Sequence, residues 1–213
     1  LGELEKDIYK GFYTTVTNFS SDETGFDNLQ GGALRPWEGT GSYFEEPHLV
    51  SFLGRVNYTF DNRYVLTLNA RTDASSKFGK NHKWGFFPSA SIAWNISEEA
   101  FMKRFRYIDN LKIRMGYGLA GNQAGIDSYT TMALVRPNGI TPTGNAPLVT
   151  YENLRNINPN LKWEVKRTFN AGFDVGLYGN RLLLSVNYYN SKTTDMLYSY
   201  NVSVPPFAHN TLL

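Results

Sequence analysis

The feature that most constrains this chain is an alternation of apolar and polar residues that begins at Leu49. Between Val50 and Phe60 the apolar side chains occupy even positions, with Leu53 as an exception, while polar residues such as Arg55 and Asn57 occupy odd ones. A period of two places the two kinds of side chain on opposite faces of an extended strand. The pattern returns in five further segments, at residues 64–73, 88–96, 111–119, 163–175 and 182–189. The sequence therefore predicts six strands, each with one apolar and one polar face.

The connections between these strands are alternately short and long. Asp61-Asn62-Arg63 and Tyr178-Gly179-Asn180 have the composition of tight turns, whereas residues 74–83 and 120–160 form long polar connections. Residues 97–103 are predicted to contain one or two helical turns, capped by the serine that begins them. Tight turns at one end of an antiparallel sheet and long loops at the other are typical of outer-membrane barrels. We therefore expect an all-β fold, a segment of an antiparallel transmembrane β-barrel with about 6–8 strands.

Composition is compatible with such a barrel and excludes several kinds of site. Mean hydropathy is −0.38, and no stretch of about 18 apolar residues is present, but barrel strands keep hydropathy low because every second residue is polar. The absence of Cys excludes disulfides, thiolate zinc sites and cysteine nucleophiles. A formal net charge of +2 gives no reason to expect a nucleic-acid partner.

Motifs for catalysis, cofactors and metals are not supported by their surroundings. Residues 116–121 fit the glycine pattern of a dinucleotide site, but a loop-like sequence follows where that motif requires a helix. The three histidines, His48, His82 and His209, lie in predicted loops and have neither metal-ligand nor triad spacing. We therefore expect no catalytic residue, no cofactor and no metal in this chain.

A soluble β-sandwich that binds carbohydrate at a cell surface is the alternative fold and function. The strands of a sandwich also alternate, and they carry aromatic residues on their inner faces. The predicted strands are longer than the usual strand of about 5–6 residues, and the long loops are too regularly placed for a sandwich. The pattern favours the barrel.

Five segments resemble the SusC/RagA type of TonB-dependent outer-membrane transporter. They occur in the order seen in that family, between about Leu49 and Pro206, and together are far more specific than any one motif. They are residues 54–58 (GRVNY), 71–79 (RTDASSKFG), 84–94 (WGFFPSASIAW), 111–122 (LKIRMGYGLAGN) and 158–164 (NPNLKWE).

The resemblance implies a fold, a location and partners. It implies a barrel of about 22 strands with an N-terminal plug domain, in the bacterial outer membrane and in contact with its lipid. It also implies energy supply through the TonB complex, a SusD-like surface lipoprotein as partner, and import of an oligosaccharide (glycan) or peptide substrate. No enzymatic activity and no nucleic-acid partner are expected.

The chain divides into two regions. Residues 1–48 are expected to form an extracellular loop region with a possible strand around Ile8 to Val16, and residues 49–213 a partial barrel. The plug domain and the remaining strands are expected to be absent. Because residues 1–6 lack the features of a signal peptide, we expect either a removed export signal or an internal segment.

Candidate functional residues fall into two groups. Aromatic residues in the long loops are candidates for contact with a substrate or with a lid protein: Trp37, Tyr43, Phe44 and Tyr129. Charged residues on the polar faces of the predicted strands are candidates for facing the barrel lumen. We favour their pairing with one another or with a plug over substrate binding. They are Arg55, Arg71, Asp73, Lys112, Arg114, Glu164 and Lys166. Arg167 has the apolar parity, and we expect it near the membrane interface, where its side chain can reach water.

The alternation also predicts orientation. Six residues are expected to face lipid, namely Val56, Leu66, Ile92, Ile113, Val165 and Val186, and six the lumen, namely Asn57, Asn69, Ser91, Lys112, Glu164 and Asn187. The loops at 73–84 and 120–160 are expected to be extracellular, and the turns at 61–63 and 178–180 periplasmic. Pro88 is expected to begin its strand or to mark a bulge, because proline cannot donate a ladder hydrogen bond.

Overall fold

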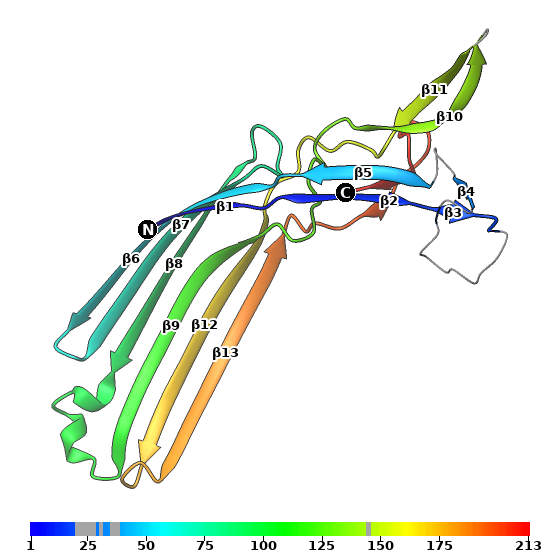
Figure 1. Cartoon of the computed structure of the whole chain (residues 1–213). Coiled ribbons are helices and arrows are strands. Elements are labelled where there is room, and N and C mark those ends of the chain that lie inside the picture. The colour runs from blue at the N-terminus through cyan, green and yellow to red at the C-terminus, as the bar shows by residue number, and fades with distance from the viewer. Residues whose placement is uncertain (20–28, 30–31, 35–38, 144–145) are drawn as a thin grey trace.

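A single seven-stranded antiparallel sheet dominates the structure. The computed structural model describes residues 1–213 except 20–28, 30–31, 35–38 and 144–145. The strand order is β1-β6-β7-β8-β9-β12-β13, and the six long strands run side by side as one layer in Figure 1. The seven strands of the sheet are β1 (Gly2–Lys6), β6 (His48–Phe60), β7 (Tyr64–Ser75), β8 (Trp84–Asn95), β9 (Ile108–Asn122), β12 (Glu164–Leu177) and β13 (Leu182–Thr194). All six strands predicted by the alternation are confirmed.

Both predicted tight turns are present, and their backbone explains their sequences. Asp61 and Asn62 have φ values of 53°, and Tyr178, Gly179 and Asn180 have φ values of 56°, 69° and 60°. Asn, Asp and Gly adopt this left-handed region most readily, so the two turns have a suitable composition. The turns therefore close β6 onto β7 and β12 onto β13 at the same end of the sheet, as Figure 1 shows.

The connection between β8 and β9 contains two short 3-10 helices, η3 (Ile96–Glu98) and η4 (Met102–Arg104). The predicted helical turns are thus present, but the predicted serine cap at Ser97 is wrong. The residue that caps η3 is Asn95, and its side chain makes no capping hydrogen bond. Ile96 and Met102 are buried, so packing under the turn end of the sheet holds this segment. Among the described residues, no helix is long and apolar enough to span a membrane.

Pro88 lies inside β8, so the prediction that it begins the strand or marks a bulge is wrong. It pairs with Ala70 of β7 without a shift of register. Backbone hydrogen bonds from Asn95 N–H to Arg63 O and from Ser75 N–H to Lys83 O show that the backbone N–H and C=O groups of odd-numbered residues along β8 point toward β7. The nitrogen of Pro88 therefore points toward β9. The pairing of β8 with β9 covers residues Ser89 to Asn95 of β8 and so does not include Pro88. Proline is tolerated because no ladder bond is required of it.

The expected loop at 120–160 contains a β-hairpin, β10 (Val135–Thr143) with β11 (Ala146–Asn153). This element was not predicted because Gly and Pro are frequent in it, and both weaken a strand. The hairpin tolerates them since it is an isolated pair of strands with a register irregularity between Pro137 and Ile140. An ion pair of 2.6 Å between Arg136 Nη2 and Glu152 Oε1 links its two strands.

The first 48 residues contain more strand than the sequence predicted. The strand expected around Ile8 to Val16 is present as β2 (Tyr9–Thr14) and β3 (Val16–Thr17), paired with β5 (Thr40–Glu45) and β4 (Ala33–Leu34). In addition, β1 pairs with β6 and so belongs to the main sheet. Five residues are too few to establish a period, which explains why β1 was not predicted. A further short pair, β14 (Tyr200–Asn201) with β15 (Thr211–Leu212), lies near the C-terminus.

A small hydrophobic core lies where the long connections leave the sheet. We call it the loop-base core; it consists of Phe78, Phe87, Ile126, Leu161 and Trp163. The ring centroid of Trp163 lies 4.8 Å from that of Phe78 and 5.5 Å from that of Phe87, and Trp163 Nε1 donates to Lys83 O at 3.0 Å. Four of these five residues belong to the segments that carry the family resemblance. Those motifs therefore hold loops together.

Candidate functional site

The register of the sheet separates its side chains into two faces. The apolar face carries aligned rows such as Tyr58, Leu66, Ile92, Met115 and Ala171, each directly opposite the next. All six residues expected to face lipid share this apolar face, and all six residues expected to face the lumen share the opposite, polar face. In the part of the chain that the structure describes, every other sheet has only two strands, so no second large sheet is present to form the sandwich alternative.

Polar side chains form a hydrogen-bonded ladder across β6, β7 and β8. Arg55 Nε donates to Asn69 Oδ1 at 2.6 Å, and Asn69 Nδ2 donates to Ser89 Oγ at 3.0 Å. One step nearer the loops, Arg71 Nε lies 2.8 Å from Asp73 Oδ2, and Arg71 Nη2 donates to Ser51 Oγ at 3.2 Å. Asp73 is buried, and the guanidinium of Arg71 neutralises its charge inside the ladder.

A second polar cluster crosses β9, β12 and β13. Arg114 Nη2 donates to Asp174 Oδ1 at 2.9 Å and to Asn187 Oδ1 at 3.1 Å. Ser185 Oγ donates to the same Asp174 oxygen at 2.6 Å. These contacts join residues that are 11 to 73 positions apart in the sequence, so the cluster ties three strands together on the polar face.

The remaining charged candidates differ from one another. Glu164 accepts hydrogen bonds from Asn122 Nδ2 and from the backbone N–H of Leu197, both at 3.1 Å. Lys112 lies opposite Asp174, and Lys166 lies opposite Ala120 and Thr193. Neither lysine forms an ion pair with another residue in the part of the chain that the structure describes. Of the seven candidates, these two lysines are thus the ones left for a ligand or another segment.

The aromatic candidates are only partly brought together. Tyr43 and Phe44 lie side by side in β5, with more than half of each side chain exposed. The ring of Tyr43 covers Gly11 so closely that a Cβ there would lie 2.8 Å from it. Tyr129 lies in the loop after β9, where its hydroxyl accepts a hydrogen bond of 3.3 Å from the Glu46 N–H. Trp37 lies outside the described residues.

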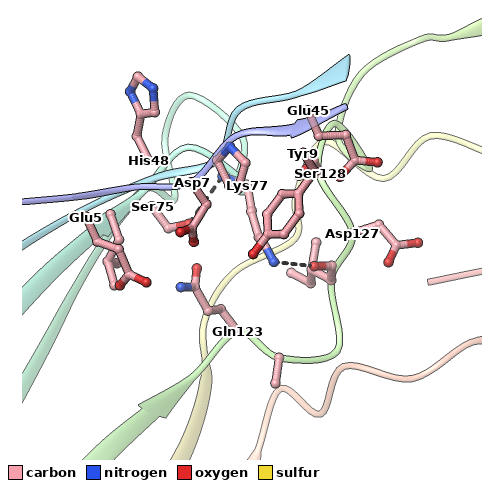
Figure 2. A pocket seen from close by; sticks show the side chains of 14 residues that line it. Glu5, Asp7, Tyr9, Glu45, His48, Ser75, Lys77, Gln123, Asp127 and Ser128 are labelled. Carbon is pink, nitrogen blue, oxygen red and sulfur yellow. Dashed lines mark hydrogen bonds between the residues drawn. The ribbon is translucent and has the colours of Figure 1, made fainter. Parts of the chain in front are cut away.

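A cavity of about 270 Å³ opens where the sheet meets the long connections. We call it the rim cavity; Figure 2 shows its walls, which come from the β1–β2 and β5–β6 connections and from the loops after β7 and β9. Asp7 and Gln123 extend into it from opposite walls (Figure 2). Its polar lining comprises Glu5, Asp7, Tyr9, Glu45, His48, Ser75, Lys77, Gln123, Asp127 and Ser128.

Several polar groups of the rim cavity keep their bonding capacity. Lys77 Nζ donates to Ile126 O at 2.9 Å, which fixes one wall. The Gln123 Oε1 atom is buried without a hydrogen-bond partner, and Glu5 and Asp7 form no ion pair with a described residue. Buried polar atoms are rarely left unpaired, so this arrangement is suited to a hydrophilic guest. Sequence reasoning missed the cavity because its residues come from four separate connections.

A charge cluster borders the cavity. Lys6 Nζ lies 2.6 Å from Glu46 Oε1, and His48 Nε2 lies 2.8 Å from the same oxygen. The hydrogen bond from Lys6, and then that from His48, lowers the pKa of the Glu46 carboxyl below its usual value of 4.5. The Glu46 carboxylate is therefore charged at neutral pH and holds β1 against the β5–β6 connection.

Chemically, the site offers hydrogen bonds and charge rather than catalytic groups. The described residues contain no cluster of three or more His, Cys, Asp or Glu side chains that could hold a metal ion. The polar face and the rim cavity together present hydroxyls, amides, carboxylates and ammonium groups to one side of the sheet. Such a surface suits reversible contact with a polar solute.

Comparison with known proteins finds a matching family model and similar sequences. Residues 3–211 match the family model described as TonB dependent receptor-like, beta-barrel. The chain is 39% identical over 199 residues to TonB-dependent receptor P3 of Formosa agariphila, covering 89% of this chain and 18% of that protein. It is 36% identical over 198 residues to TonB-dependent receptor SusC of Bacteroides thetaiotaomicron, covering 84% and 19% respectively.

Solved structures agree with the sequence relatives. The structure of the RagAB peptide transporter superposes with a TM-score of 0.73 at 28% sequence identity, covering 95% of this chain and 22% of that one. The RagAB peptide importer in its open-open state gives the same TM-score at 29% identity, covering 96% and 22%. This chain thus spans about a fifth of the length of the relatives it matches.

Proposed function

Because this chain belongs to the TonB-dependent receptor-like β-barrel family, we propose that it forms part of the barrel wall of an outer-membrane importer for oligosaccharides or peptides. TonB-dependent receptors are outer-membrane proteins, so the apolar face meets lipid and the polar face lines the lumen. The importer is energised through the TonB complex and works with a SusD-like surface lipoprotein. It transports its substrate without changing it chemically.

The observation that carries this proposal is the two-faced sheet with unequal ends. Both tight turns and the connection with η3 and η4 lie at one end of the sheet, and the loops after β7 and β9, the second of which holds the hairpin β10–β11, leave the other (Figure 1). Outer-membrane barrels place short turns in the periplasm and long loops outside the cell. The loop end is therefore extracellular, and the rim cavity and the hairpin β10–β11 lie on the side from which substrate arrives.

Contacts with the substrate are proposed at the loop end. The exposed rings of Tyr43 and Phe44 can stack on sugar rings or on apolar side chains of a peptide. Tyr129 and Trp37 are candidates for the same role or for packing against the lipoprotein. The rim cavity supplies donors and acceptors that match either hydroxyls or amides. The likeness to a peptide transporter supports a peptide, and the family resemblance of the sequence implies an oligosaccharide as the other substrate class, so the chemistry of the polymer is the first quantity to measure.

Uptake measurements in cells test the proposal. Cells with the full-length gene should accumulate a fluorescent oligosaccharide or peptide, and deletion of the gene, or depletion of TonB, should abolish that accumulation. Replacing residues 138–147 with a short Gly-Ser linker removes the tip of β10–β11 but no strand of the main sheet. This variant should insert normally and lose uptake or binding of the lipoprotein. Undiminished uptake of every tested polymer by cells lacking the gene would contradict the proposal.

A further inference from the structure

Two cations lie directly opposite each other on the apolar face. Arg167 of β12 is paired in register with Lys192 of β13, and both side chains are exposed. Their neighbours Thr168 and Ser191 contact each other through their hydroxyl oxygens at 3.0 Å, on the polar face. Because successive side chains of a strand point to opposite faces, Arg167 and Lys192 point outward.

No other charge shares this outward surface. At the outward positions of β12, β13 and residues 111–121 of β9, all of which the structure describes, Arg167 and Lys192 are the only charged side chains. The carboxylates that are nearest to the pair along the chain are engaged elsewhere. Glu164 accepts bonds from Asn122 and Leu197, and Asp195 is paired with Lys162 at 2.9 Å. Like charges placed directly opposite each other destabilise a sheet, so the pair needs an anion.

The height of the pair on the barrel wall indicates where that anion lies. From Arg167 to Leu177, at the turn end of β12, the chain rises about 3.3 Å per residue and is tilted by about 40°, which gives roughly 25 Å along the membrane normal. This equals the usual height of the apolar band of an outer-membrane barrel. The rings of Tyr107 and Tyr178, whose centroids are 5.6 Å apart, mark the opposite edge of the band. The cation pair therefore lies at the extracellular interface, level with lipid headgroups.

We propose that Arg167 and Lys192 form a binding site for the phosphate group of an outer-leaflet lipid. The guanidinium and the ammonium would share one phosphate, which removes their mutual repulsion and supplies charge-assisted hydrogen bonds. Toward the middle of the membrane, Phe169 and Tyr117 lie opposite each other on the same face, where they can pack against the acyl chains of that lipid. A headgroup above and acyl chains below favour a lipid over a free ion.

The test uses the full-length transporter in phosphatidylcholine nanodiscs and fluorescent monophosphoryl lipid A as the probe. The double variant R167Q/K192Q should weaken lipid binding at least about tenfold, because two charge-assisted bonds to the phosphate are lost. The matched control K103Q/R104Q removes the same two charges from exposed positions in η4, at the other end of the barrel, and should bind as the wild type does. Equal binding by wild type and R167Q/K192Q would overturn the proposal.

Two further measurements distinguish loss of the binding site from poor folding, and a lipid phosphate from a free phosphate. Lys192→Glu should also weaken lipid binding, but it should raise the thermal midpoint in lipid-free detergent, because opposite charges then face each other across the strands. Loss of binding with unchanged folding identifies the site even if the double variant folds poorly. Inorganic phosphate alone should not raise the midpoint of the wild type. If it stabilises the protein as lipid A does, the pair binds free phosphate and the assignment to a lipid fails.

Discussion

The two ends of the sheet are held together in different ways. At the turn end, β6 reverses within three residues and β12 within four, and the reversal depends on local backbone conformation. At the loop end, segments from four connections meet, and packing between distant residues holds them in place. The turn end is thus encoded by short-range rules and the loop end by long-range contacts. This difference also separates the barrel wall from the end of the sheet where we propose that substrate binds.

One carboxylate reinforces the turn end. Glu99, which follows η3, accepts hydrogen bonds from Tyr64 Oη at 2.7 Å, Trp94 Nε1 at 3.0 Å and Arg63 Nη1 at 3.1 Å. The bond from Tyr64, followed by that from Trp94, lowers the pKa of this carboxyl below its usual value of 4.5. The rings of Tyr64 and Trp94 stack with centroids 6.2 Å apart, so one side chain fixes two aromatic residues at the turn end of the sheet.

The largest effect should follow from disrupting the loop-base core. Trp163→Ala removes a buried ring that contacts Phe78 and Phe87, and such truncations cost about 3–5 kcal/mol. Because the loss falls at the loop end, residues 123–162 should become sensitive to protease while the strands of the seven-stranded sheet remain protected. Limited proteolysis of the reconstituted full-length protein, followed by mass spectrometry of the fragments, measures this.

A matched tryptophan gives the control for that experiment. Trp84 lies at the beginning of β8 with 60% of its side chain exposed, and it stacks on Phe52 with ring centroids 6.3 Å apart. Trp84→Ala should leave the protease pattern of the wild type unchanged. Equal sensitivity of both variants would show that the loops are not held by the loop-base core.

An intermediate effect is expected at the turn end. Gly179 has a φ of 69°, and a side chain in this conformation costs about 1–2 kcal/mol, so Gly179→Ala should destabilise the turn by that amount. Gly54→Ala is the control, since a Cβ at Gly54 meets nothing within 4 Å and its φ is not positive. Reversible urea unfolding in detergent micelles measures both variants. A Gly54 variant that is destabilised more than the Gly179 variant would contradict the local account of the turn end.

The smallest effect concerns pH at the loop end. Because the folded pKa of Glu46 lies below its unfolded value, its pairing with Lys6 and His48 stabilises the fold above pH 4.5 and is lost as pH falls further. Glu46→Gln should therefore lower the thermal midpoint slightly at pH 7, and this difference should shrink as pH falls below 4.5. Glu5→Gln, which removes a carboxylate without an ion pair among the described residues, should show no such pH dependence. A difference between wild type and Glu46→Gln that grows in acid would refute the pairing.

The same division explains what could be predicted from the sequence. The six long strands, both tight turns and the separation of the two faces follow from a period of two and from Asn, Asp and Gly in the turns. The hairpin β10–β11 could not be predicted, since Pro137 and Gly139 argue against strands and only pairing with Tyr151 and its neighbours reveals one. Likewise, Pro88 is tolerated because β8 and β9 separate there, which no local pattern indicates.

The sequence predicted on which face of the sheet the candidate residues lie, but not which residues they contact. Alternation assigned Arg114 to the polar face, but its contact with Asp174 joins positions 60 residues apart and depends on the register between β9 and β12. The rim cavity was missed entirely, because residues such as Asp7 and Gln123 lie in connections without any period. Only the folded chain brings them together.

The most direct test of the central claim is the accessibility of single cysteines on the two faces. The chain contains no Cys, so this segment contributes no background. In the full-length protein, reconstituted in nanodiscs, cysteines at positions 57, 69, 91 and 187 should react with a water-soluble maleimide, since their face lines the lumen. Cysteines at positions 56, 66, 92 and 186 should remain unlabelled, because lipid covers that face. Equal labelling of both sets would contradict the assignment of a lipid face and a lumen face, and with it the proposed barrel wall.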